Sequence, residues 1–281
     1  MPRTRTLSNG PVSAVEYVCD AAPTDAPYTE LHAAWSISYV RRGSFGCRTR
    51  GQQHDLVPGS VLIGQPGDEY LCTHDHHICG DECLAFFLAP ELVDELTAKA
   101  DAWQSGAMPA LPELVVLGEM AQAAVLGRNA LGFDEIGLAL AARFVQVLGA
   151  NRRSSHTLAA VDRRRAVESA NWIDAHAADA IDLQGLAHRA GLSPFHFLRV
   201  FSAVLGVTPH QYLIRCRLRE AARLLHHPEI PITEIAYTVG FGDLSNFVRS
   251  FGRAAGTSPG GYRQAAQGDR NFFQARMARA V

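Results

Sequence analysis

Hydrophobic and polar positions alternate over short stretches in the first third of the chain. Residues 35–40 (WSISYV) alternate with a period of two, and residues 45–49 and 60–63 form two further short runs. The turns between such runs are marked by Gly43, Pro58-Gly59 and Pro66-Gly67. Short strands separated by Gly and Pro every eight to twelve residues or so are typical of a β-barrel or jelly roll. The pattern therefore predicts a β-rich segment over about residues 12–87.

The period of the apolar positions changes after Pro90. Residues 90–103, 113–126 and 134–148 place apolar side chains three and four positions apart, which predicts three amphipathic helices. Residues 151–156 (NRRSSH) are polar and interrupt this pattern. Helical periodicity then resumes and continues almost to the end of the chain.

These patterns predict an α+β protein with two domains. The 281 residues, 47% of them apolar, are enough for two ordinary domains that each bury a core. We expect a β-barrel domain with flanking helices at 12–150 and a linker at 151–163. An all-α domain at 164–266 and a tail at 267–281 complete the predicted organisation.

The formal net charge of −2 conceals a difference between the two halves. Residues 1–162 hold 11 Lys and Arg against 19 Asp and Glu, whereas residues 163–281 hold 15 Arg against 9 acids. A basic half joined to an acidic half points to a polyanionic partner for the basic half. The alternative is an ordinary solvated surface, so charge alone does not decide between the two.

The basic half contains an internal repeat. Residues 186–191 (LAHRAG) match residues 235–240 (IAYTVG), and residues 197–201 (FLRVF) match residues 247–251 (FVRSF). After each second segment come four residues, a Gly, one further residue and then Thr-Pro or Ser-Pro. The shared pattern is F-x-R-x-F-x4-G-x-[ST]-P, and the second copy has one extra residue in the turn before its first Phe.

Each copy has the features of two short helices joined by a tight turn. Ser193 with Pro194 and, in the second copy, Asp243 are residues that begin helices. Phe197 and Phe201 lie four positions apart and therefore share one buried face. Arg199 lies about 200° around an ideal helix from Phe197, so it points outward. The same relationships hold in the second copy.

A helix, a turn with Gly and a second helix carrying an outward Arg predict a helix-turn-helix unit. We expect two units, at about 183–205 and 232–255. The residues predicted to reach the DNA are Phe195, His196 and Arg199 in the first copy and Leu244, Ser245 and Arg249 as their counterparts in the second. The alternative is that these residues lie on the surface of an ordinary helical bundle.

Residues 164–266 resemble the DNA-binding domain of the AraC/XylS family of transcription regulators over about a hundred residues without a gap. The matching positions include Leu186-Ala187, Gly191-Leu192-Ser193-Pro194, His196-Phe197, Arg199, Phe201, Gly206, Thr208-Pro209, Tyr212-Leu213, Arg217-Leu218, Ile232, Glu234-Ile235-Ala236, Gly240-Phe241, Asp243, Ser245, Phe247, Arg249, Phe251, Gly256, Ser258-Pro259 and Tyr262-Arg263.

This resemblance implies that a long helix over about residues 209–226 holds the two units apart. Both recognition helices would then contact successive major-groove segments on one face of double-stranded DNA, in an asymmetric site. The resemblance also implies that the protein activates transcription near RNA polymerase.

The N-terminal half resembles, through its strand spacing, Gly59 and Pro66-Gly67, the cupin-like effector domain of the same family. We therefore expect an unknown small-molecule effector to bind there. The predicted helices after Pro90, above all 134–148, are candidates for a homodimer interface. The alternative is that they only cover the barrel.

A cluster of thiols and imidazoles lies in residues 72–83. Cys72, His74, His76, Cys79 and Cys83 have the chemistry that binds Zn²⁺ or another transition metal. Two alternatives remain open: the thiols are small apolar fillers of the core, or they sense redox state. Apart from this candidate Zn²⁺ or other transition metal, the sequence indicates no cofactor.

Enzymatic functions fit the sequence less well. A cupin-type metalloenzyme would need an HxH pair, a Glu and a later His, and His74, His76 and Glu82 match that pattern incompletely. The alkyl-repair methyltransferases that carry this DNA-binding domain use a Pro-Cys-His-Arg site, whereas Cys216 lies in an Arg-Cys-Arg context. Because both enzyme motifs are incomplete, we expect a regulator and not an enzyme. Neither a signal peptide nor an apolar run long enough to span a bilayer is visible, so we expect this regulator to be cytoplasmic.

Overall fold

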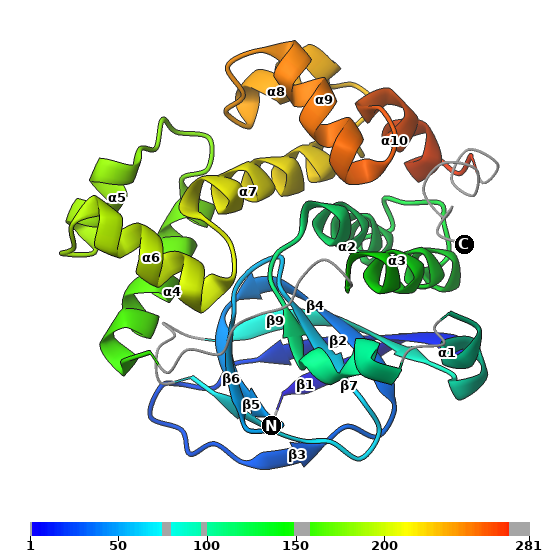
Figure 1. The fold of residues 1–281 in the computed structure, drawn as a ribbon. Coiled ribbons are helices and arrows are strands. Elements are labelled where there is room, and N and C mark those ends of the chain that lie inside the picture. Colours follow the sequence, from blue (N-terminus) through cyan, green and yellow to red (C-terminus); the bar gives the residue numbers. More distant parts are fainter. Residues whose placement is uncertain (1, 75–79, 97–99, 149–157, 270–281) are drawn as a thin grey trace.

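The computed structural model describes residues 2–74, 80–96, 100–148 and 158–269 (Figure 1). Strands gather in the N-terminal part of the chain and helices in the C-terminal part, which confirms the predicted α+β class. No helix in these described ranges is long and apolar enough to cross a bilayer.

Two antiparallel sheets face each other in the N-terminal half. The larger sheet has the order β1 (Arg3–Ser8), β2 (Val12–Cys19), β9 (Asp81–Leu88), β4 (Trp35–Gly43), β7 (Val61–Gly64) and β10 (Ala107–Met108). The smaller sheet has the order β3 (Thr29–Leu31), β8 (Glu69–Thr73), β5 (Phe45–Thr49) and β6 (Gln52–Leu56). Among the described strands no ladder joins the two sheets, so the predicted barrel is an open pair of facing sheets.

Strand β1 lies before the segment in which the sequence predicted strands. It pairs antiparallel with β2, and its first four residues are exposed. Its sequence, RTRTLS, has no buried apolar face. Such an edge strand can still form, because its backbone hydrogen bonds to the neighbouring strand hold it in the sheet. Apolar periodicity therefore carries no signal for it.

Strand β4 presents different side chains to its two sides, as the period of two requires. Ser36 and Ser38 line a cavity between the sheets. Ile37 and Tyr39 are fully buried on the opposite side, where helices cover the larger sheet. Helix α2 approaches this side so closely that a Cβ on its Gly118 would lie 2.6 Å from the Tyr39 ring.

Helices α1 (Pro90–Leu96), α2 (Pro112–Val125) and α3 (Phe133–Leu148) cover the outer side of the larger sheet (Figure 1). Pro112 occupies the first turn of α2, where its missing N–H costs nothing. The single helix predicted over 90–103 is instead α1 followed by a 3₁₀ segment at Ala100–Ser105. Helices α2 and α3 begin within one residue of the predicted positions.

Over residues 158–269 the regular elements are all helices. These are α4 (Ala160–Ala175), α5 (Leu183–Arg189), α6 (Pro194–Leu205), α7 (Pro209–Leu224), α8 (Ile232–Thr238), α9 (Leu244–Ala255) and α10 (Pro259–Ala266). Helix α7 runs between the group α4–α6 and the group α8–α10 (Figure 1). Helix α4 begins inside the segment that the sequence assigned to the linker.

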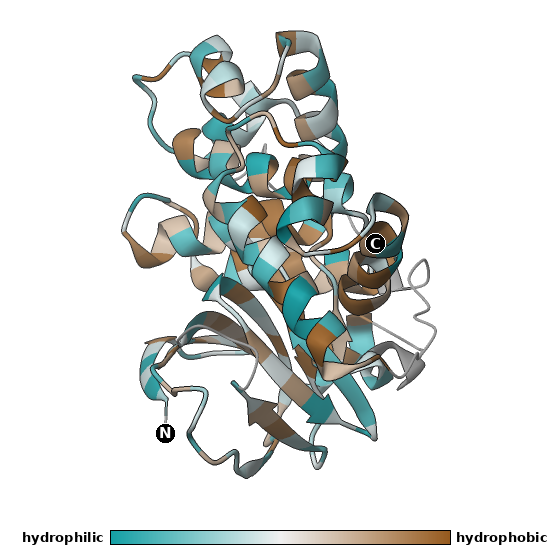
Figure 2. Ribbon diagram, turned by 90° about the vertical axis from the view of Figure 1, so that its left-hand side faces the viewer, coloured by the Kyte–Doolittle hydropathy of each residue, from teal (hydrophilic) through white to brown (hydrophobic). Residues whose placement is uncertain are grey.

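The two halves share a hydrophobic core. Buried residues of α2, such as Leu117 and Met120, belong to one cluster with Ala222 of α7 and Phe251 of α9. Figure 2 shows hydrophobic colouring where the helices meet one another and the sheet. The Tyr262 hydroxyl donates a hydrogen bond of 3.3 Å across this junction to the Val116 carbonyl. The helical half is therefore packed onto the sheet domain rather than tethered to it.

Candidate nucleic-acid interface and ligand cavity

Helices α5 and α6 form the first of two helical pairs. The turn between them contains Gly191, whose φ of +65° suits glycine. The Ser193 side chain accepts a hydrogen bond from the His196 amide, so it caps α6 as predicted. The helix ends at Gly206 with φ of +72°, a left-handed C-cap.

Helices α8 and α9 repeat this arrangement. Gly240 in the turn has φ of +94°, and a Cβ there would lie 2.8 Å from the Ala178 carbonyl oxygen. The Asp243 carboxylate accepts a hydrogen bond of 2.7 Å from the Asn246 amide and caps α9. Gly256 closes α9 with φ of +70°. The two copies thus share their caps as well as their sequence pattern.

The paired phenylalanines of each copy fix the second helix onto its unit. Phe197 and Phe201 are buried with ring centroids 5.6 Å apart, and Phe247 and Phe251 are buried at 5.7 Å. The second phenylalanine ring of each pair also contacts a tyrosine ring of the following helix. These contacts bury one face of α6 and of α9 and leave the opposite face outward.

The outward face of α6 carries the residues predicted for DNA contact. The Phe195 side chain is 77% exposed, which is unusual for a phenylalanine. Arg199 is exposed, and its Nη2 lies 3.3 Å from Nδ1 of the half-buried His196. The only contact described for the Arg199 guanidinium is with a residue of its own helix, and the side chain is exposed to solvent, where a partner can bind it.

The structure corrects the predicted correspondence between the two helices. Because Ser193 and Asp243 are both caps, Leu244 matches Pro194, and Ser245 matches Phe195. Leu244 is half-buried and packs at the edge of the shared core, so it faces partly inward. Ser245 and Arg249 are exposed.

The sequence analysis missed one outward arginine on α9. Arg253 is exposed and lies four residues after Arg249, so both share one face. The matching position on α6 is Ala203, so the two helices differ in charge as well as at their tips. The spacing of four residues from Arg249 was the signal that could have identified Arg253.

Two further arginines of the basic half serve the fold. Arg217 donates hydrogen bonds to the carbonyls of Ala177 and Asp179, before α5. Arg263 donates to the carbonyls of Leu225, Pro228 and Ile230, before α8. Both guanidinium groups hold the segment that leads into a helical pair, so the net charge overstates the cations available to a partner.

Helix α7 is fastened to α2 by one buried carboxylate. Glu119 of α2 accepts hydrogen bonds from the Tyr39 hydroxyl at 2.7 Å and from Arg223 Nε at 2.6 Å. Arg219 Nε lies 3.7 Å from the same carboxylate, and its Nη2 bonds Asp174 of α4. The Glu119 side chain has no exposed surface. Sheet, covering helix and connecting helix therefore meet at one side chain.

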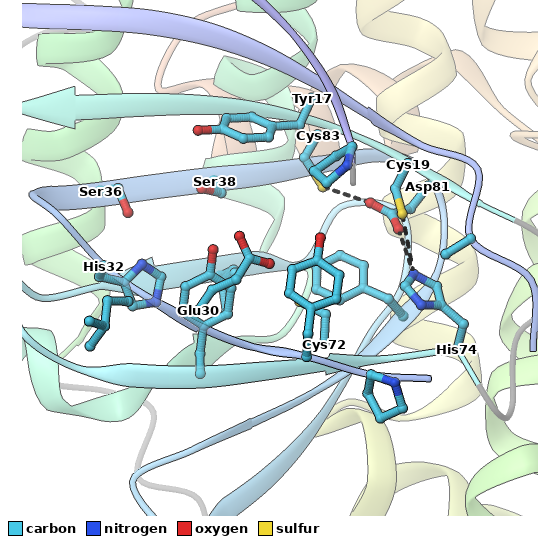
Figure 3. A pocket seen from close by; sticks show the side chains of 18 of the residues that line it. Tyr17, Cys19, Glu30, His32, Ser36, Ser38, Cys72, His74, Asp81 and Cys83 are labelled. Carbon is cyan, nitrogen blue, oxygen red and sulfur yellow. Dashed lines mark hydrogen bonds and ion pairs between the residues drawn. The ribbon is translucent and has the colours of Figure 1, made fainter. Parts of the chain in front are cut away.

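A cavity of about 570 Å³ lies between the two sheets (Figure 3). Its described lining includes Asp20, Asp25, Glu30 and Asp81 but no Lys or Arg. The remaining polar lining comes from Tyr17, Tyr28, Ser36, Ser38, Tyr70, His74 and four further residues with sulfur or imidazole groups, Cys19, His32, Cys72 and Cys83. Burial lowers the pKa of His32 to about 4, so this ring is neutral at pH 7. The cavity is therefore acidic and suits neutral or cationic groups.

The structure divides the predicted Cys/His cluster. His74 Nε2 lies 3.7 Å from Cys19 Sγ and 3.2 Å from Asp81 Oδ2 (Figure 3), and neither partner was in the predicted ligand set. Cys72 instead faces Cys47 across the β5–β8 ladder. Cys83 donates from Sγ to Asp81 Oδ1 at 3.5 Å. His76 and Cys79 lie outside the described residues.

The thiols of Cys72 and Cys83 are poorly suited to form thiolates. The hydrogen bond to Cys47 and burial raise the pKa of Cys72, and burial raises the pKa of Cys83. Cys83 belongs to the buried apolar cluster that includes Phe45 and Cys47, and Cys72 packs against that cluster, so both fit the alternative of small apolar fillers.

Two helix-turn-helix units joined by one rigid helix define a DNA-binding regulator. A family model described as a helix-turn-helix domain matches residues 186–265. The transcriptional activator RhaS of Salmonella heidelberg (strain SL476) is 31% identical over 244 residues, which cover 83% of this chain and 86% of that protein. The chain belongs to the AraC/XylS family of transcription regulators, and the predicted regulator rather than enzyme is confirmed.

Two further matches each cover little more than a third of this chain. The regulator YdeC of Bacillus subtilis (strain 168) is 33% identical over 104 residues, or 37% of this chain and 36% of that protein. The crystal structure of the DNA-binding domain of AdpA in complex with a target DNA is 33% identical, with a TM-score of 0.36. That match covers 38% of this chain and 96% of the AdpA domain.

Proposed function

We propose that this protein is a ligand-responsive transcription activator whose α6 and α9 enter successive major-groove segments of one DNA site. The carrying observation is that Arg199 and Arg249 are exposed on matched helices whose other faces are buried on the same body. Guanidinium groups there can contact guanine edges or phosphates. The similarity to the transcriptional activator RhaS supports activation, and the proposal places this activation next to RNA polymerase in the cytoplasm.

The effector site of this proposal is the cavity between the sheets. Its acidic lining, without Lys or Arg among the described residues, favours a neutral hydroxyl-rich or a cationic molecule and disfavours anions. Tyr and Ser hydroxyls supply hydrogen-bond partners for such a ligand.

Strand β4 offers a route from this cavity to the DNA-binding units. Ser36 and Ser38 line the cavity, and Tyr39 on the other side of the strand bonds Glu119. A ligand that displaces β4 would displace α2 and, through Arg223, helix α7. Because α7 separates α6 from α9, such a shift changes the fit of the pair to DNA.

Homodimerisation through α3 remains part of the proposal with a restricted surface. Most of α3 is buried against α2 and β2, while Asp134, Leu138 and Gln146 are exposed. Leu138 is 41% exposed and would lie at the centre of such a contact. Sedimentation of the full chain with and without Leu138→Glu tests this part separately.

The function is tested by selecting binding sites from random duplex DNA with the full-length protein. We expect enriched sites with two specified segments about one helical turn apart. Arg199→Ala and Arg249→Ala should each lower affinity for that site roughly 5- to 150-fold. Arg42→Ala, on the sheet with an 81% exposed side chain, is the matched control and should not change affinity. Absence of enrichment over non-specific competitor DNA would refute the function.

A further inference from the structure

Three potential metal ligands converge at one end of the cavity (Figure 3). Cys19 is the last residue of β2, Asp81 is the first residue of β9, and the two are partners in the β2–β9 ladder. His74 follows directly after β8 of the opposite sheet. The group therefore bridges the two sheets, and its three residues come from three separate segments of the chain.

Two distances within the group match those expected around one metal ion. With bond lengths of about 2.3 Å to sulfur, 2.05 Å to nitrogen and 2.1 Å to oxygen, a tetrahedral Zn²⁺ separates sulfur from nitrogen by about 3.6 Å and nitrogen from oxygen by about 3.4 Å. The corresponding distances are 3.7 Å for Cys19 Sγ to His74 Nε2 and 3.2 Å for His74 Nε2 to Asp81 Oδ2. All three ligand atoms lie within 4.8 Å of one another.

Burial and neighbouring groups favour a cation at this place. Asp81 is 9% exposed, and the His74 side chain is 11% exposed. The Cys83 thiol donates a hydrogen bond to Asp81 Oδ1, and the other carboxylate oxygen, Oδ2, lies next to His74 Nε2. Such an outer hydrogen bond orients a ligating carboxylate. The acidic lining adds to the attraction for a cation.

Gly80 brings the two strand ends together. Its φ is +53°, and a Cβ there would lie 2.4 Å from the carbonyl oxygen of Cys19. Asp81 can therefore approach Cys19 only because residue 80 has no side chain. The left-handed conformation and the missing side chain of Gly80 both permit this close approach.

We propose that Cys19, His74 and Asp81 bind one Zn²⁺ ion or a similar borderline divalent metal. The ion binds the thiolate of Cys19, and the thiol proton is released to solvent. Three protein ligands leave a fourth position, which faces the cavity and is open to water or to a polar group of a bound molecule. The inference does not depend on DNA binding, because the site lies wholly in the sheet domain.

The test uses full-length protein that has been reduced and stripped with a chelator. Titration with ZnCl₂ against a chromophoric chelator should show one ion bound per chain. Cys19→Ser, His74→Ala and Asp81→Asn should each weaken binding at least about tenfold, the loss typical of removing a metal-site contact. Cys216→Ser and Cys47→Ser are matched thiol controls and should retain full affinity.

Titration of the wild type with Co²⁺ gives an independent measurement if a variant fails to fold. A tetrahedral Co²⁺ site with one thiolate gives a sulfur-to-cobalt charge-transfer band and intense visible bands, which Zn²⁺ should abolish. No stoichiometric ion, no thiolate band, or full affinity in Cys19→Ser would overturn the proposal. Loss of binding in Cys72→Ser with retention in Cys19→Ser would overturn this ligand set. None of these measurements involves DNA, so failure here leaves the regulator function untouched.

Discussion

Tyr39 donates its hydroxyl hydrogen to Glu119 Oε1 over 2.7 Å, from the central sheet to the helix that covers it. The same carboxylate accepts from Arg223 of α7, so the bond is part of the contact between the two halves. Burial, followed by the charge of Glu119, raises the pKa of Tyr39 well above its usual value, so the phenol stays a donor. The hydroxyl of Tyr39 therefore keeps its proton over the physiological pH range.

Glu119→Gln should destabilise the protein by about 3 kcal/mol, because it leaves the buried guanidinium group of Arg219 and the half-buried one of Arg223 without their shared carboxylate. Urea unfolding of the full chain measures the change. Glu220→Gln is the matched control on α7, since the Glu220 side chain is 48% exposed in its pair with Arg223. That control should cost about 0.5 kcal/mol or less. Equal effects of the two changes would contradict the role given to Glu119.

The two turn glycines should respond differently to alanine. Gly191→Ala meets no atom within 4 Å, so it should cost only the strain of a left-handed alanine, about 1–2 kcal/mol. Gly240→Ala adds contacts of 2.8 Å with Ala178 O and 2.9 Å with Arg217 Nε, and should cost about 1–3 kcal/mol more. Chemical unfolding of both variants provides the comparison. The prediction fails if Gly191→Ala is the more harmful change.

Arg253→Ala should reduce the salt dependence of DNA binding. If Arg253 contacts a phosphate, its loss should lower the slope of log affinity against log salt by about 1 and weaken binding to all sequences alike. Affinities measured at several salt concentrations give this slope. Ala203→Arg on α6 is the reciprocal variant and should steepen the slope. An unchanged slope in both would place this face of the helices away from the DNA backbone.

His226 should make stability depend on pH. Burial lowers its pKa from 6.5 to about 4, and its Nε2 lies 3.4 Å from the Tyr262 hydroxyl. Below pH 6.5 the unfolded chain takes up a proton that the folded chain refuses until about pH 4, so stability is complete above 6.5 and falls as pH decreases. We expect a contribution of about 1 kcal/mol between pH 7 and pH 5 after allowance for partial exposure.

Unfolding free energies at pH 7 and pH 5 measure this effect in the wild type and in His226→Gln. The variant should lose the contribution of residue 226 and show a smaller difference. Tyr262→Phe is the control, because it removes a neighbouring hydroxyl without removing the imidazole. A difference unchanged in His226→Gln would show that other groups cause the pH dependence.

The DNA-binding units could be predicted because their signals are local. Caps such as Ser193 and Asp243, the Gly C-caps and the paired phenylalanines all act within a few residues of one another. The error at Leu244 arose from the longer turn of the second copy. Counting from the turn glycines pairs Leu244 with Phe195, whereas counting from the caps Ser193 and Asp243 pairs it with Pro194.

The cavity site could not be predicted in the same way. His74 and Cys19 are 55 residues apart, and only the packing of the two sheets against each other brings them together. The sequence cluster instead joined His74 to Cys72 and Cys83, whose thiols have other partners. Successive side chains of a strand point to opposite faces of the sheet. A high density of Cys and His in one short segment therefore does not show which of them lie close enough to bind one metal ion.

The hydrophobic core that passes from α2 to α7 and α9 has a consequence for folding. A boundary drawn between the two halves on the sequence does not divide the molecule into parts that unfold independently. Separation would expose the apolar faces of both halves together with the guanidinium groups that Glu119 neutralises. The sheet domain and the DNA-binding units should therefore melt in a single cooperative transition, and a fragment comprising only the C-terminal helices should be prone to self-association.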